Sequence, residues 1–123
     1  MPNNAKNSTP DHARQNRMSQ LRKELDRYVD ILKSKYSPEK IILFSSFASG
    51  NIREWSDIDL VIVKKTDKPF LDRTKDVIHL LKPRSGLDVM VYTPEEFHDL
   101  SRSRRFFQEE VISKGKVVYE AGI

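Results

Sequence analysis

The segment Asp57–Val63, which reads DIDLVIV, constrains the fold of this 123-residue chain most strongly. Its last four residues are apolar, and three of those four are β-branched. Short runs of this kind are typical of buried β-strands. We therefore predict a strand over residues 57–63, which needs neighbouring strands and a cover of apolar helices.

A helical pattern precedes this strand. Apolar residues recur at helical spacing from Leu21 to Leu32, which predicts a helix over residues 18–35. A start at Arg14 is the alternative, and Pro38 marks the end of the helix.

Further elements follow the strand. Thr93, Pro94 and Glu96 have the types and spacing of an N-cap, a first helical position and a capping-box partner, so a helix is expected to begin there. The remaining patterns predict strands over 41–46, 87–92 and 116–120 and helices over 70–82 and 103–113.

This order of elements predicts an α/β or α+β fold, with a single layer of sheet and helices packed on it. We expect one domain over residues 18–120. Residues 1–17 contain Asn, Ser, Pro and charged residues with little to pack, so we expect a disordered tail there.

The composition excludes several classes of protein. The chain has no cysteine, which excludes a disulfide scaffold, a thiolate metal site and a cysteine nucleophile. The longest apolar runs, Ile41–Phe44 and Leu60–Val63, are too short to span a bilayer. The first 17 residues lack the apolar core of a secretory signal. We expect a soluble, cytoplasmic domain without a membrane partner.

Asp57 and Asp59 begin the predicted strand with one residue between them. Residues i and i+2 of a strand share a face, so both carboxylates point the same way. Two like charges about 5 Å apart repel by roughly 3 kcal/mol at an effective dielectric of 20. A shared cation would offset that cost, and Mg²⁺ prefers oxygen ligands of this kind. The alternative is a polar strand start in which Asp57 caps a turn.

Asp88 lies within the apolar strand predicted over residues 87–92. A lone aspartate in such a strand is costly unless it is paired, liganded or at the sheet edge. If this strand neighbours the one over 57–63, Asp88 can join Asp57 and Asp59 as a third carboxylate. The alternative is an edge-strand aspartate that faces water.

Ser45 and Ser46 form a turn directly after the strand that begins at Ile41. Small residues that lead from a strand into a helix N-terminus can present backbone N–H groups and hydroxyls to an anionic ligand. By itself the dipeptide equally fits a plain turn.

Taken together, these features resemble the minimal nucleotidyltransferases of the DNA polymerase β superfamily. That family has a Gly-Ser pair after the first strand, D-x-D on the second strand and another carboxylate on a later strand. Here the pattern reads FSSFASGNIREWSDIDLVIV, followed by LDVMVY. The resemblance covers about residues 38–120 and implies a small mixed β-sheet flanked by helices.

The resemblance also implies a chemistry for the site. Asp57 and Asp59 would hold one or two Mg²⁺ ions on the triphosphate of a nucleotide, ATP. Asp88 would be the third metal-binding and catalytic carboxylate and would help to deprotonate the acceptor hydroxyl. Ser45 and Ser46 would contribute to phosphate binding. The products would be a nucleotidylated acceptor and pyrophosphate.

Two positions depart from the family pattern. Ser45 stands where the family usually has glycine, and Ser49 stands where it frequently has arginine. The Cβ of Ser45 would hinder close approach of the backbone to the triphosphate. The loss of a guanidinium at position 49 removes one phosphate clamp. We expect metal binding to survive these changes more surely than fast catalysis.

The predicted domain leaves no room for a separate acceptor-binding domain, so a partner protein or a homo-oligomer must supply that surface. The resemblance implies a HEPN-domain toxin as the partner, with this chain as the antitoxin that transfers AMP to a tyrosine hydroxyl. The alternative is a catalytically weak or inactive binding module that neutralises its partner by complex formation. Nucleic-acid binding ranks last, because it rests on a net charge of +4 and one arginine cluster.

The other polar and aromatic candidates are expected to have structural roles. They are three dispersed histidines, a tryptophan that anchors a loop and arginines at a solvated helix start, namely His12, His79, His98, Trp55, Arg102, Arg104 and Arg105.

Overall fold

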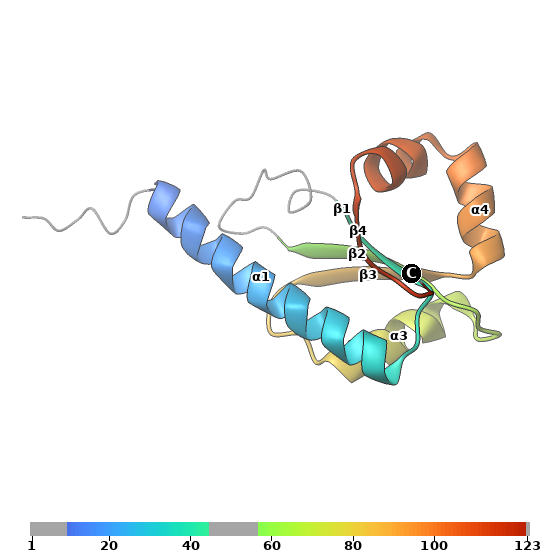
Figure 1. The fold of residues 1–123 in the computed structure, drawn as a ribbon, viewed down its shortest axis with the longest axis horizontal. Coiled ribbons are helices and arrows are strands. Elements are labelled where there is room, and N and C mark those ends of the chain that lie inside the picture. Colours follow the sequence, from blue (N-terminus) through green and yellow to red (C-terminus); the bar gives the residue numbers. More distant parts are fainter. Residues whose placement is uncertain (1–9, 45–56, 123) are drawn as a thin grey trace, which may run out of the picture.

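The computed structural model describes residues 10–44 and 57–122. Its elements in chain order are α1 (Pro10–Lys35), β1 (Lys40–Phe44), β2 (Ile58–Val63), α3 (Phe70–Leu81), β3 (Leu87–Tyr92), α4 (Pro94–Ser103), the π-helix η2 (Phe107–Ser113) and β4 (Lys116–Glu120) (Figure 1). None of the helices in this part of the chain is both long and apolar enough to cross a lipid bilayer.

The four strands form one mixed sheet in the order β3-β2-β1-β4. β1 is antiparallel to both β2 and β4, whereas β2 and β3 are parallel. A parallel pair needs a crossover connection, and α3 provides it. The sheet confirms the predicted mixed α/β fold with flanking helices.

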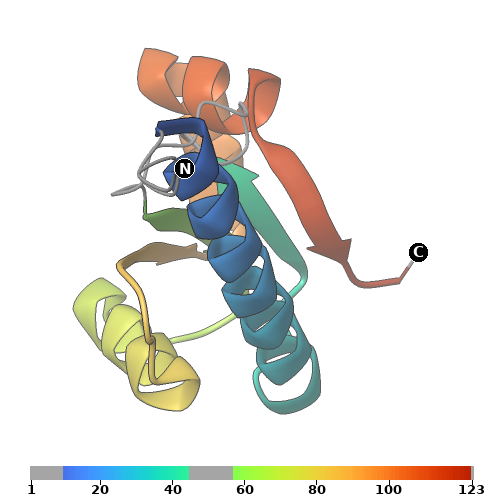
Figure 2. The same ribbon diagram turned by 90° about the vertical axis from the view of Figure 1, so that its left-hand side faces the viewer.

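One face of the sheet is covered by α1 and α3 (Figures 1 and 2). Every second residue of β1 and β2 faces these helices, because side chains alternate along a strand. The shared core contains Leu21, Leu25, Tyr28, Leu32, Ile41, Leu43, Ile58, Leu60, Ile62, Val77, Leu81, Val89 and Val91. This main core accounts for every second apolar residue of β1 and β2, and the opposite face of the sheet buries others, such as Ile42 and Val61.

The opposite face carries a smaller apolar cluster beneath α4 and η2, formed by Ile42, Phe44, Val61, Phe107 and Val111. The Phe107 ring packs edge-on against the rings of neighbouring aromatic residues at centroid distances of 5.3 and 5.5 Å. The predicted capping box at the start of α4 is confirmed.

Two helix boundaries differ from the prediction. α1 begins at Pro10 rather than at residue 18, so residues 10–17 of the predicted disordered tail are helical. Proline is well accepted in the first turn of a helix, where its missing N–H would have no partner. The last predicted helix, over 103–113, is instead a π-helix that begins at Phe107. Sequence periodicity does not distinguish a short π-helix from an α-helix.

Candidate active site

The register of the parallel strands places Asp59 and Asp88 side by side. They are direct partners across β2 and β3, and neighbouring strands lie about 4.8 Å apart. Asp59 is two residues before Val61, which belongs to the cluster under α4 and η2. Asp59 and Asp88 therefore share the α4 face of the sheet. Asp59 is half-buried and Asp88 is exposed on the edge strand.

Asp57 lies directly before β2, and its carboxylate occupies the space above Gly86. A Cβ placed on Gly86 would lie only 2.1 Å from Oδ1 of Asp57. The Ile58 N–H also donates a hydrogen bond to the Gly86 carbonyl, at 3.1 Å. Gly86 is two residues before Asp88, just as Asp57 is two residues before Asp59. The absence of a side chain at Gly86 thus makes room for the first carboxylate.

Arg17 of α1 also reaches this end of the sheet. Its Nη2 lies 3.9 Å from Oδ1 of Asp57, and its side chain is 17% exposed, against 49% for that of Asp57. Sequence reasoning missed Arg17 because it assigned residues 1–17 to a tail. It also missed Gly86, whose only sequence signal is its place in a turn before a strand.

A buried ionic network fixes the turn that leads to Gly86. The Glu24 carboxylate of α1 accepts two hydrogen bonds from Arg27, at 2.9 and 3.0 Å, and one from the Tyr28 hydroxyl, at 2.8 Å. It also accepts the backbone N–H of Arg84, at 3.1 Å. Arg27 in turn donates to the carbonyl of Leu81 at 2.7 Å. α1 is thereby tied to the α3–β3 turn.

The surroundings of Glu24 favour its ionised form. Hydrogen bonds from Arg27 lower the pKa of Glu24 to about 2, and they outweigh the opposing effect of burial. Burial and the adjacent carboxylate raise the pKa of Tyr28 above its ordinary value. The ionised network therefore holds in place the residues that lead into β3.

The predicted phosphate-binding residues follow β1. Phe44, the last residue of β1, pairs with Asp59 across the antiparallel ladder. Ser45, Ser46, Ser49 and Trp55 all lie outside the described residues. β1 therefore ends directly beside Asp59.

The three predicted carboxylates share one end of the sheet, but their side chains do not converge. Within residues 10–44 and 57–122, no group of three or more His, Cys, Asp or Glu residues is arranged to hold a metal ion. The backbone brings together Asp59 and Asp88, and Asp57 lies over the residue beside them. The donor chemistry suits a hard divalent cation such as Mg²⁺.

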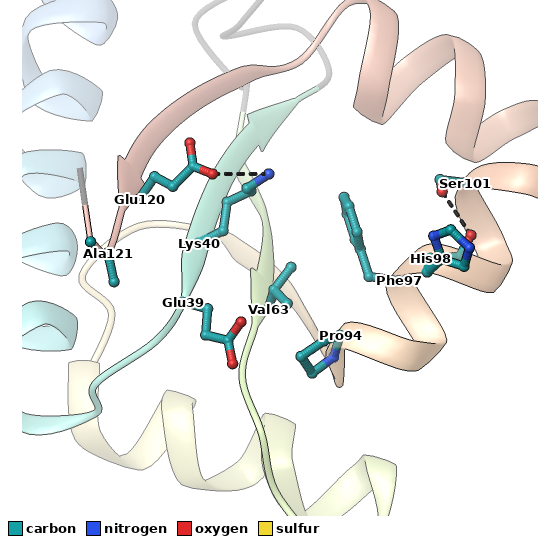
Figure 3. Close-up of a pocket in the computed structure, with 10 residues that line it drawn as sticks. Glu39, Lys40, Val63, Pro94, Phe97, His98, Ser101, Glu120 and Ala121 are labelled. Carbon is teal, nitrogen blue, oxygen red and sulfur yellow. Dashed lines mark hydrogen bonds and ion pairs between the residues drawn. The ribbon is translucent and has the colours of Figure 1, made fainter.

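A pocket of about 590 Å³ lies at the other end of β1 and β2, between these strands and α4 (Figure 3). None of the three aspartates lines it. The Lys40 ammonium lies 3.5 Å from the Glu120 carboxylate and 5.8 Å from the centre of the Phe97 ring. Two of the charged residues that line this pocket, Lys40 and Glu120, are thus paired with each other.

The remaining predicted candidates in the described residues lie on the helices or, for two arginines, between α4 and η2. His79 of α3 and His98 of α4 are exposed, as are the three arginines that follow His98. Arg105 lies 3.8 Å from Glu109. The three arginines are solvated as expected, but Arg102 is in the last turn of α4 and the other two lie between α4 and η2.

Comparison with known proteins indicates the chemistry of related chains. Two proteins of Methanocaldococcus jannaschii, both named "Putative protein adenylyltransferase", are similar in sequence. One is 33% identical over 79% of this chain and 96% of its own length. The other is 31% identical over 67% of this chain and 83% of its own length.

The fold is also found in a crystal structure described as a "putative nucleotidyltransferase" from Sulfolobus solfataricus. The TM-score is 0.66 at 20% identity, covering 89% of this chain and 88% of that one. The family model for "Polymerase beta, Nucleotidyltransferase" matches residues 26–122, so the first part of α1 precedes the matched range. The chain belongs to the polymerase beta nucleotidyltransferase family.

Proposed function

We propose that this chain is a Mg²⁺-dependent enzyme that transfers AMP from ATP to a hydroxyl group of a partner protein. The observation that carries the proposal is the register of β2 and β3, which sets Asp59 beside Asp88 on one face. The position of Asp57 over Gly86 adds a third carboxylate at the same end of the sheet. The relatives named as protein adenylyltransferases support an adenylyl donor and a protein acceptor.

The carboxylates of Asp57, Asp59 and Asp88 would hold the metal, since Mg²⁺ prefers carboxylate oxygens and keeps places for substrate phosphates. A bound Mg²⁺ supplies neutralisation of the triphosphate charge. Asp88 is on the edge strand and exposed, so an incoming hydroxyl can reach it and give up its proton there. Ser45 and Ser46, predicted from the sequence, would bind the phosphates.

We further propose that the acceptor belongs to a HEPN-domain toxin, with this chain as its antitoxin. This part of the proposal rests on the resemblance to minimal nucleotidyltransferases.

The direct test is transfer of label from ATP carrying a labelled α-phosphate to the toxin in the presence of Mg²⁺. The Asp59→Asn and Asp88→Asn variants should each lose roughly 100-fold or more in rate, as on removal of a group that stabilises transition-state charge. Asp99→Asn, which changes an exposed aspartate of α4, is the matched control and should keep full activity. No labelling by the folded wild-type protein with any divalent metal would reject the proposal.

A second function is a binding module that neutralises its partner without catalysis. The observation that favours it is the lack of a converging metal-binding group among the described residues. Under this alternative the Asp59→Asn/Asp88→Asn double variant would still bind and neutralise the toxin. Under the enzymatic proposal the same variant loses neutralisation.

A further inference from the structure

A groove lies between the outer flank of α1 and the edge strand β4. It has a volume of about 460 Å³, and its lining residues are Arg22, Leu25, Asp26, Val29, Asp30 and Val118. β4 is the last strand in the order of the sheet, and Figure 2 shows it at the margin of the ribbon, to one side of α1. The sheet therefore ends at this groove, which we call the α1–β4 groove.

An irregularity in β4 provides the apolar floor of the groove. The pairing of β1 with β4 shifts by one residue between Ile41 and Ile42, so Val118 is an extra residue in β4. Side chains alternate between the two faces of a regular strand, but Val118 and its neighbour Tyr119 both pack against the main core on the α1 face. Val118 is only half-buried there, as is Val29 on the opposite wall. Both side chains can bury more apolar surface against a further protein segment.

Asp26, Val29 and Lys33 form a stripe along the flank of α1 that faces the groove. Their spacing of three and four residues places them on one side of the helix. Asp26 and Val29 line the groove, and the Lys33 ammonium lies 5.6 Å from the centre of the Tyr119 ring of β4. Spacing of three and four residues is also that of the seam along which two helices pack together. The stripe is thus suited to contact with another helix.

The charges of this stripe match those of a second copy of the same helix. Asp26 lies one turn before Val29, and Lys33 lies one turn after it. Both charged side chains are exposed, and neither has an ion pair within residues 10–44 and 57–122. When two α1 helices lie antiparallel with Val29 at a two-fold axis, each Asp26 faces Lys33 of the partner subunit. The symmetry forms the same ion pair twice, whereas a stripe of one charge would repel its own copy.

We propose that two copies of this chain form an antiparallel, two-fold symmetric dimer, in which the Asp26–Val29–Lys33 stripe of each copy lies in the α1–β4 groove of the other. Val29 and Val118 form the apolar centre of the interface, and the ion pairs flank it. None of the three aspartates of the candidate active site lines the groove, so this inference is independent of the proposed function.

The first test is the oligomeric state of the full chain, measured by sedimentation velocity from about 1 µM to about 1 mM, the range in which weak interfaces saturate. The mass of the wild-type protein should rise from 14.4 kDa toward twice that value. A wild-type protein that stays monomeric throughout this range overturns the dimer.

Charge reversal then tests whether the stripe is the interface. Lys33→Glu replaces both ion pairs by repulsion between carboxylates, so the dissociation constant should rise at least about tenfold. Lys35→Glu makes the same change of charge at an exposed position two residues further on, which a helix places on another side, and it should change the dissociation constant by about twofold or less. Circular dichroism would verify that both variants fold. Equal effects of the two substitutions would overturn the assignment of the interface.

A mixture of two variants gives the sharpest result. Asp26→Lys alone should weaken the dimer as Lys33→Glu does, because it sets two lysines against each other. In a mixed dimer, however, the introduced lysine faces the introduced glutamate, and the unchanged Asp26 and Lys33 face each other. Sedimentation of Lys33→Glu labelled at its N-terminus, with unlabelled Asp26→Lys in excess, should therefore recover a dissociation constant within about threefold of the wild-type value. A mixture that associates no more tightly than either variant alone overturns the inference.

Discussion

Two groups of carboxylates in this chain differ in their surroundings. Glu24 is buried and accepts hydrogen bonds from Arg27, Tyr28 and a backbone N–H, all within 3.1 Å. The aspartates at the end of the sheet are more exposed, and the side chain of Asp57 is 49% exposed. A carboxylate with its lone pairs satisfied by the protein stabilises the fold, whereas an exposed carboxylate such as that of Asp57 or Asp88 can accept a ligand. The comparison predicts that removal of the Glu24 carboxylate destabilises the fold, whereas neutralisation of Asp59 stabilises it slightly.

Removal of the buried carboxylate should have the largest effect. Glu24→Ala leaves the Arg27 guanidinium and the Tyr28 hydroxyl without their acceptor, and loss of one partner of a buried pair costs about 3–5 kcal/mol. Urea unfolding would measure this loss. Glu95→Ala, at an exposed position of α4, is the control and should change the unfolding free energy by about 0.5 kcal/mol or less. A loss below about 1 kcal/mol for Glu24→Ala would contradict the structural role.

Acid should destabilise the protein through the same group. The pKa of Glu24 is lowered from 4.5 to about 2, so its stabilising contribution is fully present above pH 4.5 and is lost as the pH falls toward 2. The shift corresponds to roughly 3 kcal/mol. Unfolding free energies measured from pH 6 to pH 2.5 should fall more steeply for the wild-type protein than for Glu24→Gln. Parallel pH profiles for the two proteins would show that Glu24 is not held ionised.

Gly86→Ala should displace the Asp57 carboxylate without unfolding the protein. The added methyl meets the Asp57 carboxylate and must push it aside. We expect Mn²⁺ affinity to fall about tenfold, equivalent to about 1.4 kcal/mol, as measured by calorimetry. Gly122→Ala, where an added Cβ meets nothing within 4 Å but the positive φ of 81° strains the backbone locally, is the control for metal binding alone. Equal Mn²⁺ affinity in both variants would exclude a role for Asp57 at the metal site.

The smallest effect is expected from Asp59→Asn in the absence of ligand. It relieves repulsion with Asp88, so the melting temperature should rise slightly, by the equivalent of less than about 1 kcal/mol. The stabilisation that Mn²⁺ and ATP give the wild-type protein by mass action should disappear. A lower melting temperature without ligand would instead show that Asp59 is a structural residue.

The sequence allowed much of the fold to be predicted, because its signals there are local. The apolar run Leu60–Val63 predicts the buried strand β2, and the capping residues around Thr93 specify the start of α4. The sequence predicts the pairing of Asp59 with Asp88 only if the strands that hold them are neighbours. Strand order and register decide that point.

The residues missed by sequence analysis depend on contacts between distant segments. Gly86 matters because the register of β2 and β3 places it beneath Asp57. Arg17 matters because α1 begins at Pro10 and reaches the end of the sheet. Neither fact follows from local composition or periodicity.

The most direct test of the central claim is the affinity of the protein for ATP with and without Mn²⁺, measured by calorimetry. We predict saturable binding by the wild-type protein that requires the metal and falls at least about tenfold in Asp59→Asn/Asp88→Asn. Equally tight, metal-dependent ATP binding by the folded double variant would contradict the assignment of these aspartates as the metal and nucleotide site.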